Sequence, residues 1–282
     1  MCIKHDWCSM VISRALGKTE AKFLADLAST DKTIFTTDDA RSVTGSSSAA
    51  VDLLIARLIR KKWLIRLNRG AYLIVPLSAG EQAEYSESWF VVARSLIEPA
   101  DYYLSHFSAL EIHEMTNNPV LTVYISTPVR RIEKRIAGAT YRFISVRPEN
   151  MWGSTETWVT PSQRVCVSDL ERTIIDCLDR PDLCGGIIEV AKGLWAKRDV
   201  VDFGRLAAYT KRLGRKSVVK RLGYLLGVFE LGTPELTGVL VETLSPSYAL
   251  LDPTLPDEGH YVRKWRVRVN LNPDELRAAV TT

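Results

Sequence analysis

One stretch of this sequence combines a helical repeat of apolar residues with two short apolar runs around a turn. Apolar side chains recur there at spacings of three and four residues, which is typical of an amphipathic helix. They are Val51, Leu54, Ile55, Leu58 and Ile59. The runs 64–67 and 71–75 flank an Asn-Arg-Gly turn and predict a β-hairpin. Because proline cannot donate to a β-ladder, Pro76 marks the end of that hairpin.

Two shorter helices are expected before this one. Residues 19–29 carry apolar side chains at helical spacing. Residues 36–39 offer a cap and two acids for the first turn of a second helix, which Gly45 can end in a left-handed conformation. The serines at 46–48 supply the next cap. The order helix, helix, tight turn, helix, hairpin predicts a winged helix-turn-helix domain over residues 15–78.

The rest of the chain, residues 79–282, predicts a second domain that mixes helices and strands. Strands rich in β-branched and aromatic residues are expected at 120–126, 140–146 and 261–269, with one or two more in 157–167. Helices are expected at 81–97, 105–115, 168–179, 185–197, 202–213 and 215–228. The expected fold class is therefore α+β, with an N-terminal winged helix-turn-helix domain and a mixed α/β C-terminal domain. Residues 1–14 are expected to form a poorly ordered tail.

The composition excludes several broad classes of protein. With 46% hydrophobic and 25% charged residues, the chain has ordinary globular composition. Its apolar runs are far shorter than the roughly 20 residues of a bilayer span, and it begins without the apolar stretch of a secretory signal. Its five cysteines show no C-x-x-C spacing. We therefore expect no disulfide framework, no metal and no cofactor, and a cytoplasmic location.

Basic residues gather at the end of the third predicted helix and in the hairpin. Residues 57–69 contain no acid, and their basic residues are Arg57, Arg60, Lys61, Lys62, Arg66 and Arg69. In a winged helix-turn-helix, the N-terminus of the third helix contacts base edges while neighbouring residues hold phosphates. The candidate contacts there are Ser46, Ser47 and Ser48, and those of the wing are Arg66, Asn68 and Arg69. Basic side chains that oppose the helix dipole would explain Lys61 and Lys62, but not the basic residues of the wing. The pattern therefore predicts binding to double-stranded DNA.

Four segments carry a resemblance to a known family. They read LIRKKWLIRLNRGAYLI at 58–74, YLSHFSAL at 103–110, VSDLERTIIDCL at 167–178 and KRLGYLL at 220–226. In this order they resemble the AbiEi-type antitoxins, which are regulators of viral-defence systems. His113 is followed by Glu114, where the family pattern leads us to expect glycine.

The resemblance implies a two-domain antitoxin of an abortive-infection toxin–antitoxin system, without enzymatic activity. The N-terminal domain would bind operator DNA and repress its own operon. The C-terminal domain, residues 79–282, would oppose a nucleotidyltransferase-like toxin.

A second basic segment spans residues 192–221, which hold 10 basic and 2 acidic residues. The resemblance favours a surface for the toxin or for RNA bound to it. The candidate residues are Lys197, Arg198, Arg205, Lys211, Arg212, Arg215, Lys216, Lys220 and Arg221. A second DNA-backbone contact and a solvated helical face are the alternatives.

Two other functions stay open at this point. A metal-dependent nuclease with a winged-helix targeting domain would use Asp169, Glu171 and Asp176 as ligands, although Asp169 and Glu171 lie about 200° apart on a helix. A simpler interpretation is a capping box with Ser168 at the N-cap and Glu171 at N3, followed by an i, i+4 pair of Arg172 with Asp176. The other alternative is a protein-interaction module that does not bind DNA.

The two histidines of the segment 105–115 are a further candidate for metal binding. His106 and His113 are seven residues apart and lack the H-E-x-x-H pattern of zinc proteases. Packed or capping histidines are therefore expected.

Overall fold

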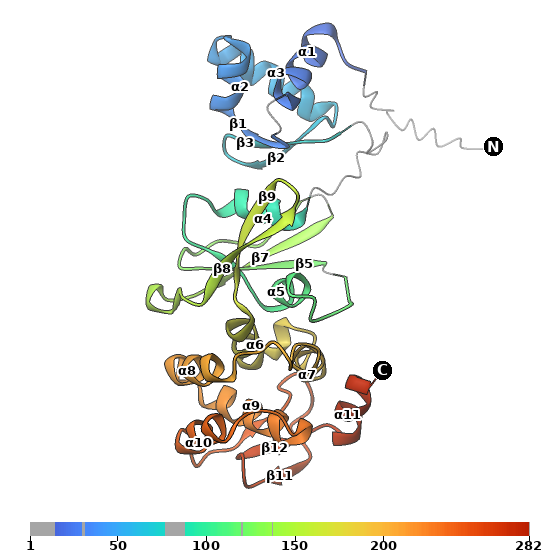
Figure 1. Cartoon of the computed structure of the whole chain (residues 1–282). Coiled ribbons are helices and arrows are strands. Elements are labelled where there is room, and N and C mark those ends of the chain that lie inside the picture. Colours follow the sequence, from blue (N-terminus) through green and yellow to red (C-terminus); the bar gives the residue numbers. More distant parts are fainter. Residues whose placement is uncertain (1–14, 30–31, 77–87, 120, 137, 282) are drawn as a thin grey trace, which may run out of the picture. The chain divides into compact units, whose positions relative to one another are not determined.

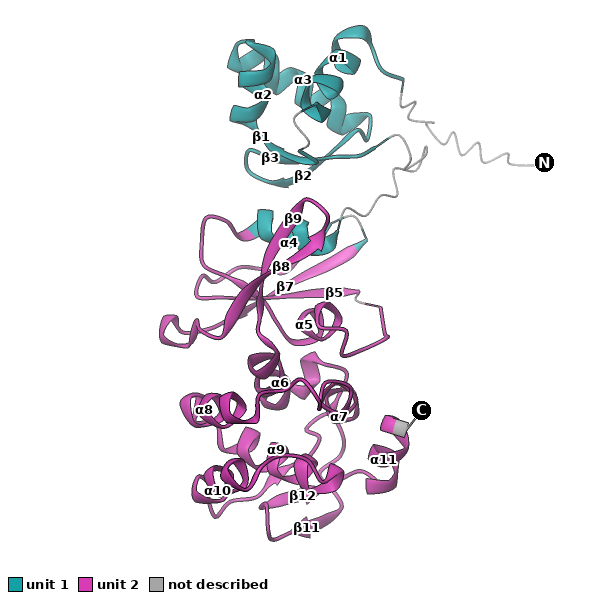
Figure 2. Cartoon of the chain, in the orientation of Figure 1, with its two compact units in different colours: residues 1–96, 136–138 teal, residues 97–135, 139–282 magenta. Residues whose placement is uncertain are grey.

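The computed structural model describes residues 15–29, 32–76, 88–119, 121–136 and 138–281 (Figure 1). The chain divides into two compact units (Figure 2). Unit 1 runs to Leu96 and includes Ile136–Gly138, and unit 2 holds the rest of the chain. The predicted domain boundary between residues 78 and 79, the predicted tail 1–14 and the first part of the helix predicted at 81–97 lie outside the described residues.

Unit 1 contains four helices and a three-stranded sheet among its described residues. Its elements are α1 (Lys18–Ala28), β1 (Ile34–Thr36), α2 (Thr37–Thr44), α3 (Ser48–Arg60), β2 (Leu64–Asn68), β3 (Ala71–Ile74) and α4 (Trp89–Ile97). The strands pair in the antiparallel order β1-β3-β2. The first three helices and the hairpin were predicted from the sequence, whereas β1 was not.

Local capping chemistry explains where α2 and α3 begin and end. The hydroxyl of Thr36 accepts from the backbone N–H of Asp39, whose carboxylate accepts in return from the N–H of Thr36. Gly45 ends α2 with φ 61°, the left-handed conformation that glycine adopts at little cost. The hydroxyl of Ser47 then caps α3. The sequence-predicted caps therefore lie where they were expected.

The apolar core of unit 1 lies between the helices and the sheet. Phe35 of β1 lies with its ring centroid 6.0 Å from that of Phe23 and 5.6 Å from that of Tyr72. From α3, the core takes the residues that the helical repeat predicted to be buried, namely Val51, Leu54, Ile55 and Leu58. Ile59 is only half-buried against that cluster. The single strand β1 thus closes the core through one aromatic side chain.

Unit 2 begins with a six-stranded mixed sheet. Its strands are β4 (Tyr103–Leu104), β5 (Thr122–Thr127), β6 (Lys134–Ile136), β7 (Ala139–Ser145), β8 (Ser154–Thr160) and β9 (Gln163–Ser168). They lie in the order β6-β7-β5-β4-β9-β8. The pairs β5–β7 and β4–β9 are parallel, and β4–β5 and β8–β9 are antiparallel. The strands predicted at 120–126, 140–146 and 157–167 are all present, the last as two strands.

The helices of unit 2 come next, and the first two of them pack against this sheet (Figure 1). They are α5 (His106–Ile112), α6 (Leu170–Asp179), α7 (Ile187–Ala196), α8 (Phe203–Leu213), α9 (Lys216–Phe229), α10 (Pro234–Glu242) and α11 (Pro273–Thr281). Short 3-10 turns cover Pro148–Asn150 and Pro181–Leu183. A small sheet of β10 (Ala249–Leu250), β11 (His260–Val262) and β12 (Val267–Val269) has the order β10-β12-β11. The four helices predicted between 168 and 228 are confirmed.

Two predictions for unit 2 were wrong in detail. The strand predicted at 261–269 is an antiparallel pair, β11 and β12, because the chain reverses at residues 263–266, where Arg266 has φ 53°. The N-cap of α6 is Asp169, not Ser168, since Ser168 still pairs with Ser154 as the last residue of β9. The carboxylate of Asp169 accepts from the N–H of Arg172 at 2.8 Å.

Glu114 occupies a position where the backbone favours glycine. It follows the end of α5 and has φ 54°. The glycine expected from the family pattern would adopt this conformation without the steric cost that a side chain brings.

No single helix in the described part of the chain is long and apolar enough to cross a membrane. The bent pair α2 and α3 passes that test together, by length and composition alone.

The packing of α9 on the small sheet leads to a first prediction. Gly223 lies in α9 against the indole of Trp265, and a Cβ at this position would collide with the ring carbons. We expect Gly223→Ala to lower the free energy of unfolding by about 1–3 kcal/mol, because overpacking forces side chains and backbone to shift. Urea denaturation of the full chain measures it.

The matched control for this substitution is Gly238→Ala in α10. Nothing lies within 4 Å of a Cβ at Gly238, so alanine there should raise stability by up to about 1 kcal/mol through its helix propensity. Equal stability of the two variants would contradict the close packing of Gly223 on Trp265.

Candidate nucleic-acid interface

The helix α3 presents an exposed N-terminus after a sharp turn. The chain bends by 112° between α2 and α3. Ser46, Ser47 and Ser48 are all exposed, and the first turn of α3 contains no acid. Ser47 caps the helix, and Ser48 accepts a hydrogen bond from Nη2 of Arg41 at 2.8 Å. The hydroxyl of Ser46 donates to the carbonyl oxygen of Thr44 at 3.4 Å, so all three predicted serines already make hydrogen bonds within the chain.

The outer face of α3 is opposite its buried stripe. Leu53 is 65% exposed on this face, and Arg57 and Arg60 are exposed further along it. Lys62 follows the helix with φ 58° and is exposed as well. Among the described residues, none of these three basic side chains forms an ion pair, so their charges are available to a ligand.

Lys61 differs from its basic neighbours because it has a buried partner. Its Nζ lies 2.6 Å from Oε2 of Glu20. The hydrogen bond from Lys61 and the one from the N–H of Gly17 lower the pKa of the Glu20 carboxyl. Lys61 therefore joins the end of α3 to the start of α1. Glu20 was not predicted as the partner of Lys61. The sequence does offer one signal for the position of Glu20, since a glycine three residues before a glutamate is compatible with a helix start.

The hairpin turn carries two exposed arginines and one structural asparagine. Arg66 and Arg69 are exposed on either side of Asn68. The Nδ2 group of Asn68 donates to the carbonyl oxygen of Leu96 in α4 at 2.9 Å. The amide N–H of Asn68 is therefore used within unit 1, and the DNA contact expected of this residue stays a prediction.

The second basic segment divides into surface and interior residues. Lys220 and Arg221 are buried. Nζ of Lys220 donates to the carbonyl oxygen of Ser247 at 2.6 Å, and Nη1 of Arg221 donates to that of Leu178 at 2.7 Å. Burial lowers the pKa of Lys220. These two residues tie α9 to neighbouring segments, so their predicted place on a partner surface is corrected.

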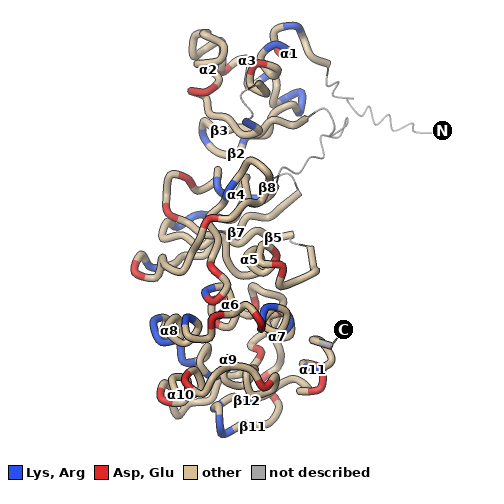
Figure 3. The backbone as a smooth tube through the Cα atoms, viewed as in Figure 1, with Lys and Arg blue, Asp and Glu red and all other residues tan. Residues whose placement is uncertain are grey.

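The other predicted partner-binding residues are exposed or half-buried, and Figure 3 shows the basic residues of α8 gathered on that helix. Several of them contact acidic or aromatic side chains. The ion pairs are Lys197 with Glu114, Arg205 with Glu171 and Arg215 with Asp179. Arg198 and Arg212 stack on Trp195 and Trp152 at 4.3 Å, and Lys216 donates to the carbonyl oxygen of Thr243. Lys211 is exposed on α8.

The acids considered for a nuclease point to separate partners. Asp169 accepts from the hydroxyl of Tyr209 at 2.8 Å, in addition to capping α6. Glu171 accepts from the N–H of Asp202. Asp176 pairs with Arg172 at 2.8 Å, as the sequence predicted. In the part of the chain that the structure describes, no group of three or more His, Cys, Asp or Glu could hold a metal ion.

The two histidines considered for metal binding lie in separate environments. Nε2 of His113 lies 2.6 Å from the carbonyl oxygen of Ser168 and joins the end of α5 to the end of β9. His106 is buried at the start of α5. Both are packed side chains, as the sequence predicted.

The comparisons with known proteins bear first on unit 1. Residues 22–75 match the model of a family described as transcriptional regulator, AbiEi antitoxin. This segment is therefore similar to the AbiEi antitoxin regulators. The resemblance predicted from the sequence is confirmed over this range, which contains α2, α3 and the hairpin. No curated protein matches the chain.

One solved structure shares the fold of nearly the whole chain. It is the crystal structure of the RV2827C protein from Mycobacterium tuberculosis, with a TM-score of 0.69 and 16% sequence identity. The similarity covers 96% of this chain and 97% of that one. At this identity the likeness shows a common fold.

The pair of Lys61 with Glu20 gives a pH-dependent prediction. The folded-state pKa of Glu20 is lowered. Its carboxylate therefore stabilises the fold fully at pH values above the ordinary glutamate pKa of about 4.3. That contribution is lost as the pH falls through the lowered pKa. We expect Glu20→Gln to cost about 1 kcal/mol at pH 7 and much less near pH 3. Calorimetric unfolding of the full chain at both pH values measures this.

Asp52→Asn is the control, since Asp52 is exposed on α3. The same loss for Glu20→Gln at both pH values would show that the ion pair does not cause it.

Proposed function

We propose that this chain is a transcriptional regulator that binds the operator DNA of its own operon. The observation that carries the proposal is the set of exposed basic side chains in the last turn of α3 and in the β2–β3 turn, on a helix whose first turn contains no acid. The AbiEi match over residues 22–75 supports a regulatory role. In this proposal the domain is a repressor without catalytic activity.

We propose a winged helix-turn-helix as the DNA-binding fold. A bend of 112° between α2 and α3 agrees with the 90–120° typical of helix-turn-helix pairs. The antiparallel hairpin β2–β3 follows α3 directly and would serve as the wing. In such domains the second helix of the pair enters the major groove, which here is α3.

The outer face of α3 has the chemistry that this role requires. Leu53 is an exposed apolar residue, and an apolar side chain in the major groove can contact the methyl group of thymine. Arg57 and Arg60 lie on the same face and are long enough to reach phosphates or guanine. The buried stripe keeps the face in place by holding the helix against the core.

The wing would add contacts to the DNA backbone. Arg66 and Arg69 flank the turn, and Gly70 between the strands has φ 78°, which lets the hairpin turn tightly. Neither arginine forms an ion pair among the described residues. Their charges can therefore neutralise phosphates and release counterions.

We also propose that the chain acts as the antitoxin of an AbiE-like toxin–antitoxin system. The support is the family match, together with the exposed basic side chains of α8 and of the start of α9. Lys211, Arg212 and Lys216 would form part of a surface for a nucleotidyltransferase-like toxin. Charge complementarity at such a surface would speed association with an acidic partner.

The wing arginines give a direct test of DNA binding. Arg66→Ala and Arg69→Ala should each weaken binding to the DNA upstream of the gene and reduce the slope of log K against log salt by about 1. Fluorescence anisotropy at several salt concentrations measures both. The thermal midpoint should not change, because neither side chain is buried.

Lys22→Ala, an equal loss of charge at an exposed position of α1, is the matched control. Unchanged binding by both wing variants, or an equal loss in the control, would exclude the wing as a contact.

Leu53 tests sequence recognition separately from affinity. We expect Leu53→Ala to reduce the preference for operator over scrambled DNA by about 1 kcal/mol, since one apolar base contact is lost. The salt slope should stay the same, because no charge changes. Competition binding with both duplexes measures the preference, and a changed slope with an intact preference would contradict this role.

A further inference from the structure

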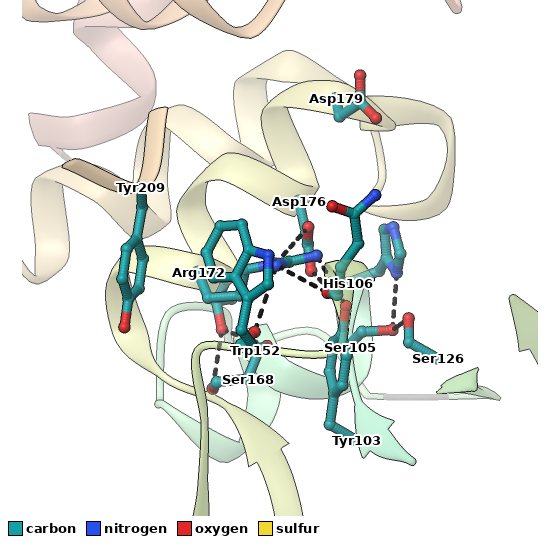
Figure 4. Close-up of polar contacts among 12 residues, drawn as sticks. Tyr103, Ser105, His106, Ser126, Trp152, Ser168, Arg172, Asp176, Asp179 and Tyr209 are labelled. Atoms are coloured by element: carbon teal, nitrogen blue, oxygen red, sulfur yellow. Dashed lines mark hydrogen bonds and ion pairs between the residues drawn. The ribbon is translucent and has the colours of Figure 1, made fainter. Parts of the chain in front are cut away.

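A polar cavity lies within unit 2, away from the residues discussed for DNA binding. Its volume is about 510 Å³, within the range of small-molecule sites. Its walls come from five stretches of the chain, namely β4 with the start of α5, β5, the end of β7 with the segment that follows it, α6, and the turn between α8 and α9. Figure 4 shows part of this wall with Tyr103, His106 and Arg172.

Arg172 forms a rigid part of the wall because each of its three nitrogens has a partner. Its Nε pairs with Asp176 at 2.8 Å, and its Nη2 donates to the hydroxyl of Tyr103 at 3.0 Å. Its Nη1 donates to the carbonyl oxygens of Asn150 and Trp152 at 3.2 Å, and the guanidinium stacks 4.0 Å from the centre of the Trp152 ring. This guanidinium therefore organises the wall.

His106 has one ring nitrogen, Nε2, without a hydrogen-bond partner among the described residues. The residue is only 4% exposed and has φ 54°, an uncommon conformation for a side chain with a Cβ. The hydroxyl of Ser126 donates to that of Ser105, whose own proton is left to bond with Nδ1 of His106 at 2.8 Å. From this direction we infer that Nδ1 accepts, which places the proton of the neutral ring on Nε2.

The Nε2–H group of His106 has no hydrogen-bond partner among the described residues, although the ring lines the cavity. Burial, followed by the charge of Arg180, lowers the pKa of His106 to about 3. The ring is therefore neutral near pH 7 and acts as a donor without adding a charge. This ring can therefore offer a hydrogen bond to a ligand or to solvent in the cavity without an internal competitor among the described residues.

The N-terminus of α9 opens at the rim of the same cavity. Gly214 and Arg215, which line it, immediately precede this 14-residue helix. No side chain caps the helix, and its first turn contains no acid. Its first backbone N–H groups and its dipole therefore favour an anion at this position.

Two arginines at the rim keep guanidinium groups within reach of an anion. Arg147 contacts Glu149 at 3.8 Å, and Arg215 contacts Asp179 at 3.6 Å. Both separations exceed a charge-assisted hydrogen bond, so these carboxylates compete weakly. Planar guanidinium groups bind phosphate oxygens in a bidentate manner.

We propose that this cavity binds a small phosphate monoester. The phosphate is held by Nε2–H of His106, the guanidinium groups of Arg147 and Arg215, and the N-terminal N–H groups of α9. The organic part lies against Ile144 at the end of β7 and Val146 just after it, with the polar Asn150 beside them. Phosphate binding here does not depend on DNA binding by unit 1.

The test is calorimetric titration of the full chain with inorganic phosphate, ribose 5-phosphate and the four nucleoside 5′-monophosphates, with the unphosphorylated nucleosides as controls. We expect the phosphates to bind and the nucleosides not to bind. Tighter binding of nucleotides than of ribose 5-phosphate would identify a nucleotide as the source of the phosphate. Binding of nucleosides, or no binding of any phosphate at millimolar concentration, would overturn the proposal.

Variants of the rim separate a phosphate site from a structural role. Arg147→Gln and Arg215→Gln should each weaken phosphate binding at least tenfold, while Lys211→Gln, an equal loss of one charge on exposed α8, should change it less than twofold. Asp179→Asn should tighten binding several-fold, because it removes the carboxylate that competes for Arg215. A purely structural role of Asp179 would not tighten binding, so an unchanged or weaker affinity in this variant would contradict the site.

His106 is tested by substitution and by its tautomer. His106→Asn keeps a residue that tolerates positive φ and should abolish phosphate binding. Long-range ¹⁵N–¹H spectra of the wild-type chain should show the Nε2–H tautomer, with the Nε2 signal shifting on addition of phosphate. If His106→Asn does not fold, the spectra and the rim variants test the phosphate site in its place. An Nδ1–H tautomer that phosphate leaves unshifted would overturn the assignment of His106.

Discussion

The turn between α2 and α3 determines what the first unit can do. Gly45 reverses the chain in a left-handed conformation, and hydroxyl caps at Thr36 and Ser47 start the helices on either side. Because the inner stripe of α3 is packed in the core, the outer face that carries Leu53 and Arg57 has one fixed direction. A helix that is held in this way can present its side chains to a groove without losing further conformational entropy. The proposed DNA contacts of α3 depend on this constraint.

Unit 2 is organised around a different interaction, the buried guanidinium of Arg172. It joins α6 to β4 through Tyr103 and to the segment 150–152 through two carbonyl oxygens. A buried charge is tolerable only when it is paired and well hydrogen-bonded, and here each nitrogen has a partner. The same network gives the neighbouring cavity a rigid wall. Burial raises the pKa of Asp176 to about 6 despite the opposing effect of Arg172.

The sequence predicted the parts of the fold that rest on short-range patterns. The stripe of α3, the Asn-Arg-Gly hairpin and the glycine after α2 were each readable within about ten residues. The strand β1 was not, because its three residues are too short to show an alternation. The cap of α6 was misplaced by one residue, since only pairing with Ser154 shows that Ser168 is still in a strand.

The candidate sites were less predictable than the fold. Lys220 and Arg221 look like surface charges in a basic run, but the carbonyl oxygens that satisfy them come from residues 27 to 43 positions away. The amide of Asn68 likewise donates to a carbonyl oxygen of a distant segment, that of Leu96 in α4. The cavity around His106 draws on five separate segments of the chain, so no local motif could have indicated it. A run of basic residues shows where lysines and arginines are in the sequence. Tertiary hydrogen bonds determine which of them face solvent.

The most direct test of the proposed DNA binding is a salt titration of the full chain with the DNA upstream of its own gene and with a scrambled duplex. If the five exposed basic side chains of α3 and the hairpin contact phosphates, log K should fall with log salt at a slope of about −4.5. We predict this slope together with tighter binding to the upstream DNA at every salt concentration. No binding, or equal affinity for both duplexes throughout, would contradict it.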